Sequence, residues 1–271
     1  MTTVLDKIVA VKRQEVAQAR AERPLGELRA ALVDAPPVRD YLAPLSRERP
    51  DPSQAGGGGP IKLIAEVKKA SPSAGLIRAD FDAVEIAQTY AACGASCLSV
   101  LTDEPHFQGS LDYLKAVRAA VDLPVLRKDF LIDEHQVVEA RVAGADAVLL
   151  IAECLTPAEL IDLHALATDL GLTVLVELYE PANLPAVLAC NPKLVGVNNR
   201  DLRTMTVDRE HCIRLRQQVP PEVVFVGESG VKTHADAQRL RAAGIDAMLV
   251  GESLMRQADL PLAVKSLLGK D

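Results

Sequence analysis

The segment Ile61–Ser73, IKLIAEVKKASPS, places a carboxylate and an ammonium group two residues apart at the end of an apolar run. Alternate side chains of a β-strand share a face, so Glu66 and Lys68 would point to the same side. The residues around them leave almost no polar face, which is typical of a strand buried on both sides in a parallel sheet. An exposed ion pair would be worth little, but two charges on a buried strand are costly unless they serve a site. We therefore expect the end of this strand to belong to an active site.

The chain after residue 60 alternates short apolar runs with longer segments of helical periodicity, several of which are followed by glycine. Eight such units with parallel, apolar strands predict an α/β fold, a single (β/α)8 TIM barrel. A doubly wound open sheet is the alternative, but no GxGxxG follows the first strand. The predicted strands are 63–67, 96–101, 125–128, 147–151, 173–178, 194–198, 223–226 and 247–250. The predicted helices are 82–93, 110–121, 133–143, 156–170, 181–189, 207–219, 233–243 and 258–268.

Residues 1–46 form an N-terminal helical extension, with helices predicted over 4–22 and 25–33. One interpretation is that these helices cap an end of the barrel; the other is a lid over the active site, which the basic residues of the first helix would suit. Residues 47–60, which include four consecutive glycines, have the composition of a flexible linker. Residues 61–271 then complete the barrel, and we expect the whole chain to be one structural domain.

Composition excludes several classes of protein. The net charge is −7, aromatic residues make up 3% and there is no Trp, so nucleic acid is a poor partner. No apolar run reaches membrane-spanning length and no signal peptide is recognisable, which predicts a soluble, cytoplasmic protein. The five cysteines contain no CxxC and are expected to be free thiols, and the scattered histidines give no support to a metal site.

Polar residues recur at the carboxyl ends of the predicted strands, where catalysis takes place in such barrels. Each has an ordinary alternative explanation; Lys128, for example, could belong to a surface charge run and pair structurally with Glu177. Because all these polar residues would meet at the same end of the barrel, together they predict a functional site there. The turns after the last two strands, GESG at 227–230 and GES at 251–253, resemble a phosphate grip in which backbone N–H groups approach an anion. Lys68 and Arg200 would supply cationic partners.

The motifs IAEVKKASPSAG, SVLTDEPHFQGS, PVLRKDFLID, LVELYE, VGVNNRDL, GESGV and LVGESLM occur in this order over about residues 61–256. Together they resemble the indole-3-glycerol-phosphate synthase family of tryptophan biosynthesis, which also carries an N-terminal helical extension. The resemblance implies a carboxy-lyase that closes the ring of 1-(2-carboxyphenylamino)-1-deoxyribulose 5-phosphate, losing CO₂ and water, with no cofactor and no metal.

The resemblance also implies roles for individual residues. The general acid falls on Lys128, the second proton-transfer residue on Glu177, and other catalytic or orienting positions on Glu66, Lys68 and Asn198. We expect the acid to be an ammonium group with a lowered pKa, working with a carboxylate whose pKa is raised. The implied substrate-binding and phosphate-binding set is Lys68, Ser71, Arg200, Glu228, Ser229, Gly230, Gly251 and Glu252, with Phe107 and Phe130 near the anthranilate ring. The side chain of Glu252 is expected to face away if its amide is used.

Three alternatives remain open. Phosphoribosylanthranilate isomerase would favour a Cys/Asp pair at strand ends, and Cys97 lies at the start of a strand, towards the opposite mouth. An aldolase would work through a lysine Schiff base, and a non-catalytic binder of a phosphorylated ligand would not need separated acid and base residues. The expected partner is a phosphorylated small molecule, without nucleic acid or membrane. We expect a monomer and leave open a weak association with other enzymes of the tryptophan pathway.

Overall fold

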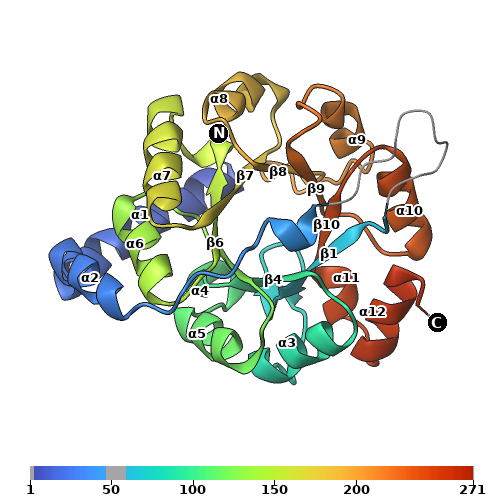
Figure 1. The fold of residues 1–271 in the computed structure, drawn as a ribbon, viewed down its shortest axis with the longest axis horizontal. Coiled ribbons are helices and arrows are strands. Elements are labelled where there is room, and N and C mark those ends of the chain that lie inside the picture. Colours follow the sequence, from blue (N-terminus) through green and yellow to red (C-terminus); the bar gives the residue numbers. More distant parts are fainter. Residues whose placement is uncertain (1–2, 47–58, 271) are drawn as a thin grey trace.

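The computed structural model describes residues 3–46 and 59–270, so most of the expected linker, 47–58, lies outside the described residues. Eight parallel strands close into a barrel in the order β1-β10-β9-β8-β7-β6-β5-β4, with β4 paired back to β1 (Figure 1). The (β/α)8 prediction is confirmed, and no predicted strand end is misplaced by more than two residues. The barrel strands are β1 (Lys62–Val67), β4 (Cys97–Leu101), β5 (Val125–Lys128), β6 (Ala147–Ile151), β7 (Thr173–Leu178), β8 (Leu194–Asn198), β9 (Val224–Glu228) and β10 (Ala247–Val250).

Helices surround the strands as predicted, and several begin with a side-chain cap; Asp82, Ser110, Asp133 and Thr233 each accept a backbone N–H of the first turn. The outer helices are α3 (Ala83–Ala92), α5 (Leu111–Ala120), α6 (Glu134–Val142), α7 (Pro157–Asp169), α8 (Leu184–Ala189), α9 (His211–Arg216), α10 (His234–Ala242) and α12 (Leu260–Leu268). The helix predicted over 207–219 is shortened to α9, because Val207 instead pairs with Arg200 in an isolated antiparallel bridge.

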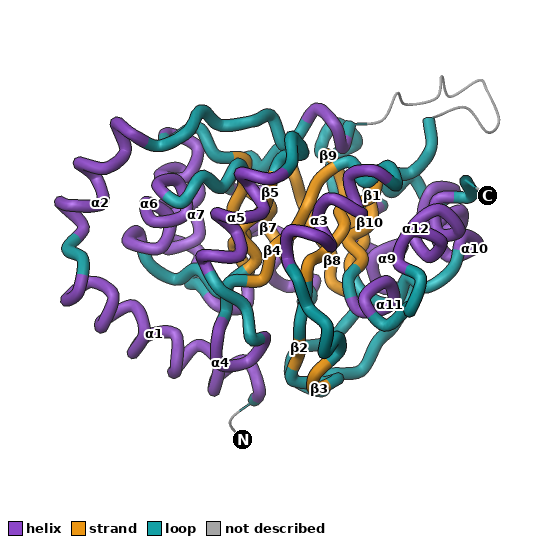
Figure 2. The backbone as a smooth tube through the Cα atoms, turned by 90° about the horizontal axis from the view of Figure 1, so that it is seen from below, coloured by secondary structure: helices purple, strands orange, loops and turns teal. Residues whose placement is uncertain are grey.

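Small elements near the carboxyl ends of the strands were not predicted. They are the hairpin strands β2 (Ala70–Ser71) and β3 (Gly75–Leu76) and the one-turn helices α4 (Glu104–Phe107) and α11 (Glu252–Met255). Such short pieces carry no hydrophobic period of their own, so a pattern search passes over them. Figure 2 shows β2, β3 and α4 at the same end of the barrel as the N-terminal helix.

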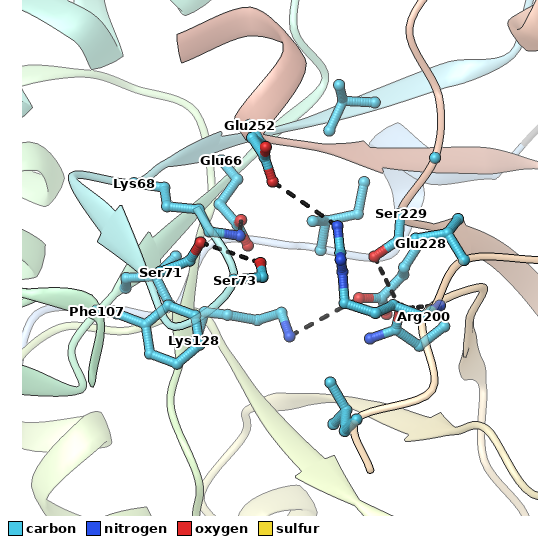
Figure 3. A pocket seen from close by; sticks show the side chains of 18 of the residues that line it. Glu66, Lys68, Ser71, Ser73, Phe107, Lys128, Arg200, Glu228, Ser229 and Glu252 are labelled. Carbon is cyan, nitrogen blue, oxygen red and sulfur yellow. Dashed lines mark hydrogen bonds and ion pairs between the residues drawn. The ribbon is translucent and has the colours of Figure 1, made fainter. Parts of the chain in front are cut away.

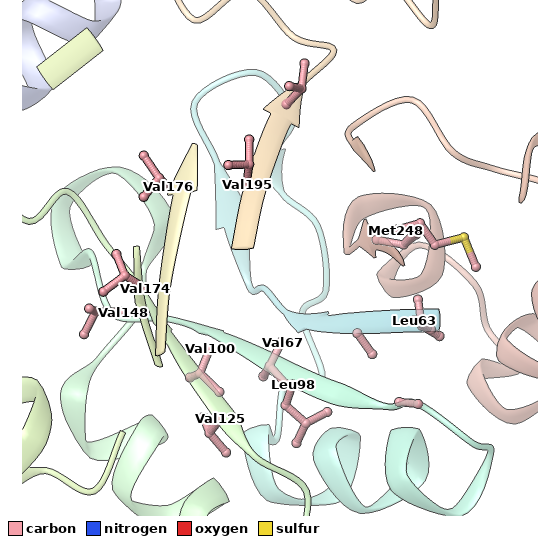
Figure 4. Close-up of a cluster of buried hydrophobic side chains, with 14 of the residues drawn as sticks. Leu63, Val67, Leu98, Val100, Val125, Val148, Val174, Val176, Val195 and Met248 are labelled. Carbon is pink, nitrogen blue, oxygen red and sulfur yellow. The ribbon is translucent and has the colours of Figure 1, made fainter. Parts of the chain in front are cut away.

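Two hydrophobic clusters follow from the alternation of side chains along each strand. On β1, Leu63, Ala65 and Val67 face outward and pack with the helices, in the cluster that Figure 4 shows in part. Ile64 between them faces the barrel interior, which is filled by residues such as Leu126 and is a separate cluster. Because both faces are buried, the strands read as continuous apolar runs.

The N-terminal extension contacts both ends of the barrel interior. Its first helix, α1 (Val4–Glu22), places Leu5 and Ile8 in the interior cluster on the side of the site. After α2 (Leu25–Ala31) and the turn η1 (Leu32–Asp34), the chain reaches η2 (Ala43–Leu45). There the fully buried Tyr41 donates a hydrogen bond to the Leu98 carbonyl on β4. Helix α1 therefore lies over the end of the barrel that holds the cavity, whereas the other end is closed by η2, which lies outside the two predicted helices.

Candidate active site

A cavity of about 560 Å³ opens at the carboxyl ends of the strands. Figure 3 shows Lys128 and Arg200 reaching towards it from different sides, with Lys68 and Glu252 at its rim. The structure brings every predicted site residue to the wall of this cavity. These residues are Glu66, Lys68, Ser71, Phe107, Lys128, Phe130, Glu177, Asn198, Arg200, Glu228, Ser229, Gly230, Gly251 and Glu252.

The two-residue period of the strands explains why these side chains meet. Ile64 fills the interior of β1, and Glu66 on the same face reaches the level of the cavity. The same step takes the chain from Leu126 to Lys128 on β5 and from Leu175 to Glu177 on β7. Each of these three strands thus presents an apolar residue to the packed interior and a polar residue to the cavity.

Lys128 lies in a group of carboxylates rather than in a surface charge run. Its Nζ donates to Glu177 Oε2 at 2.9 Å and lies 3.8 Å from Glu228 Oε2. Burial opposes the charge on Lys128, but the carboxylates of Glu177, Glu228 and Glu66 outweigh it and raise the pKa of this lysine. The expectation of a lowered pKa was wrong, because the effect of three carboxylates on one ammonium group exceeds that of burial.

Glu177 and Glu228 have opposite protonation preferences. Burial would raise the pKa of Glu177, but the charge and hydrogen bond of Lys128, together with a hydrogen bond from Asn198, hold it below its usual range. Burial and the neighbouring Glu177 carboxylate raise the pKa of Glu228 well above its usual range. Of these two carboxyl groups, Glu228, at the end of β9, is therefore the one that binds a proton more readily. Glu228 was predicted as part of the phosphate-binding set, and its carboxyl group lies 3.8 Å from Lys128 Nζ.

Gly196 on β8 was missed by sequence reasoning, and it makes room for Glu228. A Cβ at this position would lie 2.3 Å from Glu228 Oε1 and 3.1 Å from a methyl group of Leu175. The backbone of Gly196 pairs in register with Glu177 on one side and Val226 on the other. A glycine inside an otherwise apolar strand is the signal for such a close approach.

A second ion pair stands at the end of β1. Lys68 Nζ donates to Glu66 Oε1 at 2.9 Å, and the Ser99 hydroxyl of β4 lies 3.4 Å from Glu66 Oε2. Lys68 Nζ also lies 5.7 Å from the centre of the Phe107 ring, and the rings of Phe107 and Phe130 are 6.1 Å apart. This side of the cavity therefore combines an ammonium group with two aromatic walls, which suits an aromatic carboxylate.

Asn198 connects the carboxyl group to the predicted anion site. Its amide nitrogen donates to Glu177 Oε1 at 3.0 Å, while its oxygen accepts from the Ser229 hydroxyl at 2.8 Å and the Arg200 amide at 3.0 Å. Both lone-pair directions of the amide oxygen are thus used, which fixes the orientation of the side chain.

The turn after β9 forms part of the wall of the cavity. Ser229 and Gly230 have φ angles of 64° and 82° and line the cavity, and turns of this kind can present backbone N–H groups to an anion. At the neighbouring turn, a Cβ on Gly251 would lie 2.6 Å from Glu66 Oε1, so only glycine fits there. Glu252 does not face away as expected: its carboxylate lies 3.7 Å from Arg200 and also pairs with Arg256 at 3.1 Å. Glu252 thus supplies a negative charge close to Arg200.

Within residues 3–46 and 59–270, no group of three or more His, Cys, Asp or Glu side chains has an arrangement that could hold a metal ion. No helix in this part of the chain combines the length and apolar character needed to cross a bilayer.

The fold and the cavity define a (β/α)8-barrel protein whose candidate site lies at the carboxyl ends of its strands. Solved barrels share this architecture: a 3-hexulose-6-phosphate synthase superposes with a TM-score of 0.62 at 20% identity, over 78% of this chain and 99% of that one. The corresponding enzyme from Salmonella typhimurium gives 0.63 at 14% identity, over 78% and 98%. Identities this low show the fold alone.

Sequence comparison is more specific. The family model of indole-3-glycerol phosphate synthase matches residues 5–267. The indole-3-glycerol phosphate synthase of Rhodopirellula baltica is 56% identical over 266 residues, which cover 98% of this chain and 99% of that protein. That of a Polaromonas species is 48% identical over the full length of both chains. The chain belongs to the indole-3-glycerol phosphate synthase family.

Proposed function

We propose that this protein converts 1-(2-carboxyphenylamino)-1-deoxyribulose 5-phosphate into indole-3-glycerol phosphate, with loss of CO₂ and water. Family membership supports the reaction. The observation that carries the proposal is the group of Lys128, Glu177 and Glu228, which lies in one cavity with an anion-binding turn and a pair of aromatic rings. Acid–base chemistry on a phosphorylated aromatic substrate needs the proton-transfer group, the anion-binding turn and the aromatic rings together.

The two ends of the substrate are bound at different parts of the cavity. The phosphate lies at the turns of Ser229, Gly230 and Gly251. Arg200 gives up its contact with Glu252 and pairs with the phosphate. The aromatic ring packs against Phe107 and Phe130, and its carboxylate lies near the ammonium group of Lys68. This orientation places the ribulose carbonyl over Lys128, and it supplies the proximity that ring closure requires.

Lys128 is the acid in the first step. The ring carbon that bears the carboxylate forms a bond to the carbonyl carbon of the ribulose chain, and the carbonyl oxygen takes a proton from Lys128. A raised pKa ensures that this lysine carries its proton at neutral pH. A ligand that displaces Glu177 or excludes water brings the pKa down towards the value that proton transfer favours. Loss of CO₂ then restores the aromatic ring.

Glu177 and Glu228 act in the dehydration. The hydroxyl group formed in the first step leaves as water after it receives a proton, and the adjacent carbon loses one to complete the indole. Protonated Glu228 is suited to donate, and ionised Glu177 is suited to accept, because their environments separate their pKa values. The pair is coupled, so its two protonation steps belong to the pair as a whole.

The site supports the alternatives less well. A Schiff-base aldolase needs a neutral lysine. In this site the carboxylates raise the pKa of Lys128 more than burial lowers it, which favours the charged form. For an isomerase with a Cys/Asp pair, Cys97 lies at the start of β4, where its thiol contacts the Tyr41 carbonyl at the far end of the barrel. A protein that only binds a ligand does not need two carboxyl groups whose pKa values are shifted in opposite directions.

We also infer that the protein works in the reducing environment of the cytoplasm and as a monomer. The five cysteines, all within the described residues, are free, which supports a reducing compartment. Sedimentation at micromolar concentration tests the oligomeric state; a dimer would contradict it.

The decisive experiment supplies the carboxyphenylamino substrate to the purified protein with a chelator present and follows indole fluorescence. We expect product to appear at a rate proportional to enzyme concentration. Substrate turnover to a non-indole product, or none at all, would exclude the proposed activity.

A further inference from the structure

Lys12 is a buried lysine on helix α1 whose neighbours belong to the barrel. Its side chain is 4% exposed, and its Nζ lies 2.9 Å from Asp103 Oδ2, 2.9 Å from Asp129 Oδ1 and 2.6 Å from Glu15 Oε2. Asp103 and Asp129 are 0% and 3% exposed. They follow β4 and β5, so an ammonium group near the N-terminus joins two loops about a hundred residues further along the chain.

Each of these carboxylates organises the backbone next to an aromatic ring. Asp103 begins α4 by accepting the His106 amide at 2.9 Å, and α4 carries Phe107. Asp129 accepts the amide of Phe130 at 2.8 Å. The two rings face each other in the cavity at 6.1 Å. Lys12 therefore acts on both walls of the aromatic half of the site without lining the cavity itself.

The same helix contributes to the wall directly. Ile8, one turn before Lys12, lines the cavity, and Leu5, Ile8 and Val9 pack in the cluster that contains Phe130. The turn that holds the predicted phosphate site comes from β9 and β10, on elements that Lys12 does not contact. The influence of Lys12 should thus be confined to one half of the ligand.

We propose that Lys12 is a positioning residue that fixes the Phe107–Phe130 pair and so sets the affinity for the aromatic end of the substrate. The physical basis is that Lys12 is the cation that Asp103 and Asp129 share, whereas Arg127 pairs with Asp129 at 3.3 Å. When the shared ammonium group is removed, the two buried carboxylates repel each other. The loops that they organise then separate, and the rings lose their spacing. This inference rests on the proposed function for the identity of the aromatic group.

The test compares two ligand fragments. In Lys12→Met, we expect the dissociation constant of 2-aminobenzoate, measured by calorimetry, to rise about tenfold, while that of inorganic phosphate changes less than about twofold. In turnover, KM should rise more than kcat falls. Lys7→Met is the matched control, because Lys7 is an exposed lysine of the same helix, and it should leave both constants unchanged.

A lysine that only attached α1 to the barrel would weaken both fragments equally or neither, and that result would overturn the proposal. If Lys12→Met does not fold, Asp103→Asn decides, because it keeps the oxygen that caps α4 and removes the charge that faces Lys12. It should show the same selective loss, and equal loss would again reject the inference. If the wild-type protein makes no indole product, the proposed function fails, while the fragment titration still decides the role of Lys12.

Discussion

The side-chain amide of Asn198 donates to Glu177 Oε1 at 3.0 Å, on the carboxyl group whose other oxygen accepts from Lys128. Glu177 is thereby held on both sides, with its charge stabilised and its orientation fixed. The amide oxygen of Asn198 also accepts from Ser229, so a single residue joins the proton-transfer group to the anion turn.

Asn198→Ala should therefore affect both halves of the site. Loss of the bond to Glu177 should lower kcat about tenfold to a hundredfold, and release of the Ser229 hydroxyl should raise KM severalfold. A double-mutant cycle with Ser229→Ala checks the connection. Additive effects of the two substitutions would show that Asn198 does not link the groups.

Lys128→Ala should keep substrate binding and lose most turnover. A positioned proton donor contributes a factor of about 10²–10⁴ to the rate. Single-turnover kinetics with the bound substrate separate the chemical step from binding. Lys193→Ala, at an exposed lysine, is the control and should behave as wild type; near-normal turnover in Lys128→Ala would rule it out as the acid.

Arg200→Ala should mainly raise KM, by about tenfold to a hundredfold, because a charge-assisted contact to phosphate is lost. Glu252→Gln should lower KM modestly, because Arg200 no longer has to leave a carboxylate 3.7 Å away. Steady-state kinetics on both variants give the comparison. An unchanged KM in Arg200→Ala would remove this residue from the phosphate site.

Gly196→Ala tests the space that Glu228 occupies. The added methyl group would lie 2.3 Å from Glu228 Oε1, so the carboxyl group must move away from Glu177 and Lys128. We expect kcat to fall about a hundredfold, the typical contribution of a positioned proton-transfer group.

Gly26→Ala is the matched control for this substitution. Gly26 lies in helix α2 with nothing within 4 Å of an added Cβ. Alanine there should leave activity unchanged and stabilise the fold by about 0.5–1 kcal/mol. Full activity in Gly196→Ala would mean that Glu228 can move without consequence.

Glu228 should make stability depend on pH. Burial and the Glu177 charge raise its pKa in the folded state, so the folded protein binds the Glu228 proton more tightly than the unfolded chain. The stabilisation that comes from this proton is present below the unfolded value of about 4.3 and is lost as pH rises through the folded pKa.

Glu228→Gln removes the loss of stability that wild type shows as pH rises, because glutamine does not ionise. Its melting temperature relative to wild type should increase with pH, while its turnover falls because no proton can be donated. Thermal unfolding of both proteins across the pH range provides the measurement. A difference in melting temperature that stays constant with pH would show that Glu228 has no raised pKa.

Most of the fold could be predicted because each strand combines a continuous apolar run with turn or helix signals on both sides. Val125–Lys128 and Thr173–Leu178 were placed to the residue. The hairpin β2–β3 and helix α4 were not predicted, because each is too short to carry a hydrophobic period. Helix α4 is a single turn capped by Asp103, and Asp103 in turn pairs with the distant Lys12. Local propensity contains no information about such contacts.

The sequence by itself determined which residues form the site. A barrel gathers the carboxyl ends of its strands, and the two-residue period then turns Glu66, Lys128 and Glu177 inward, so their meeting follows from order and spacing. What only the tertiary structure decided is the charge state of these groups. Proton affinity depends on burial and on the distance to other charges, and neither is written along the chain. That is why the structure was needed to show that the raised pKa belongs to Glu228 rather than to Glu177, and that a lysine on the first helix pairs with carboxylates of two barrel loops.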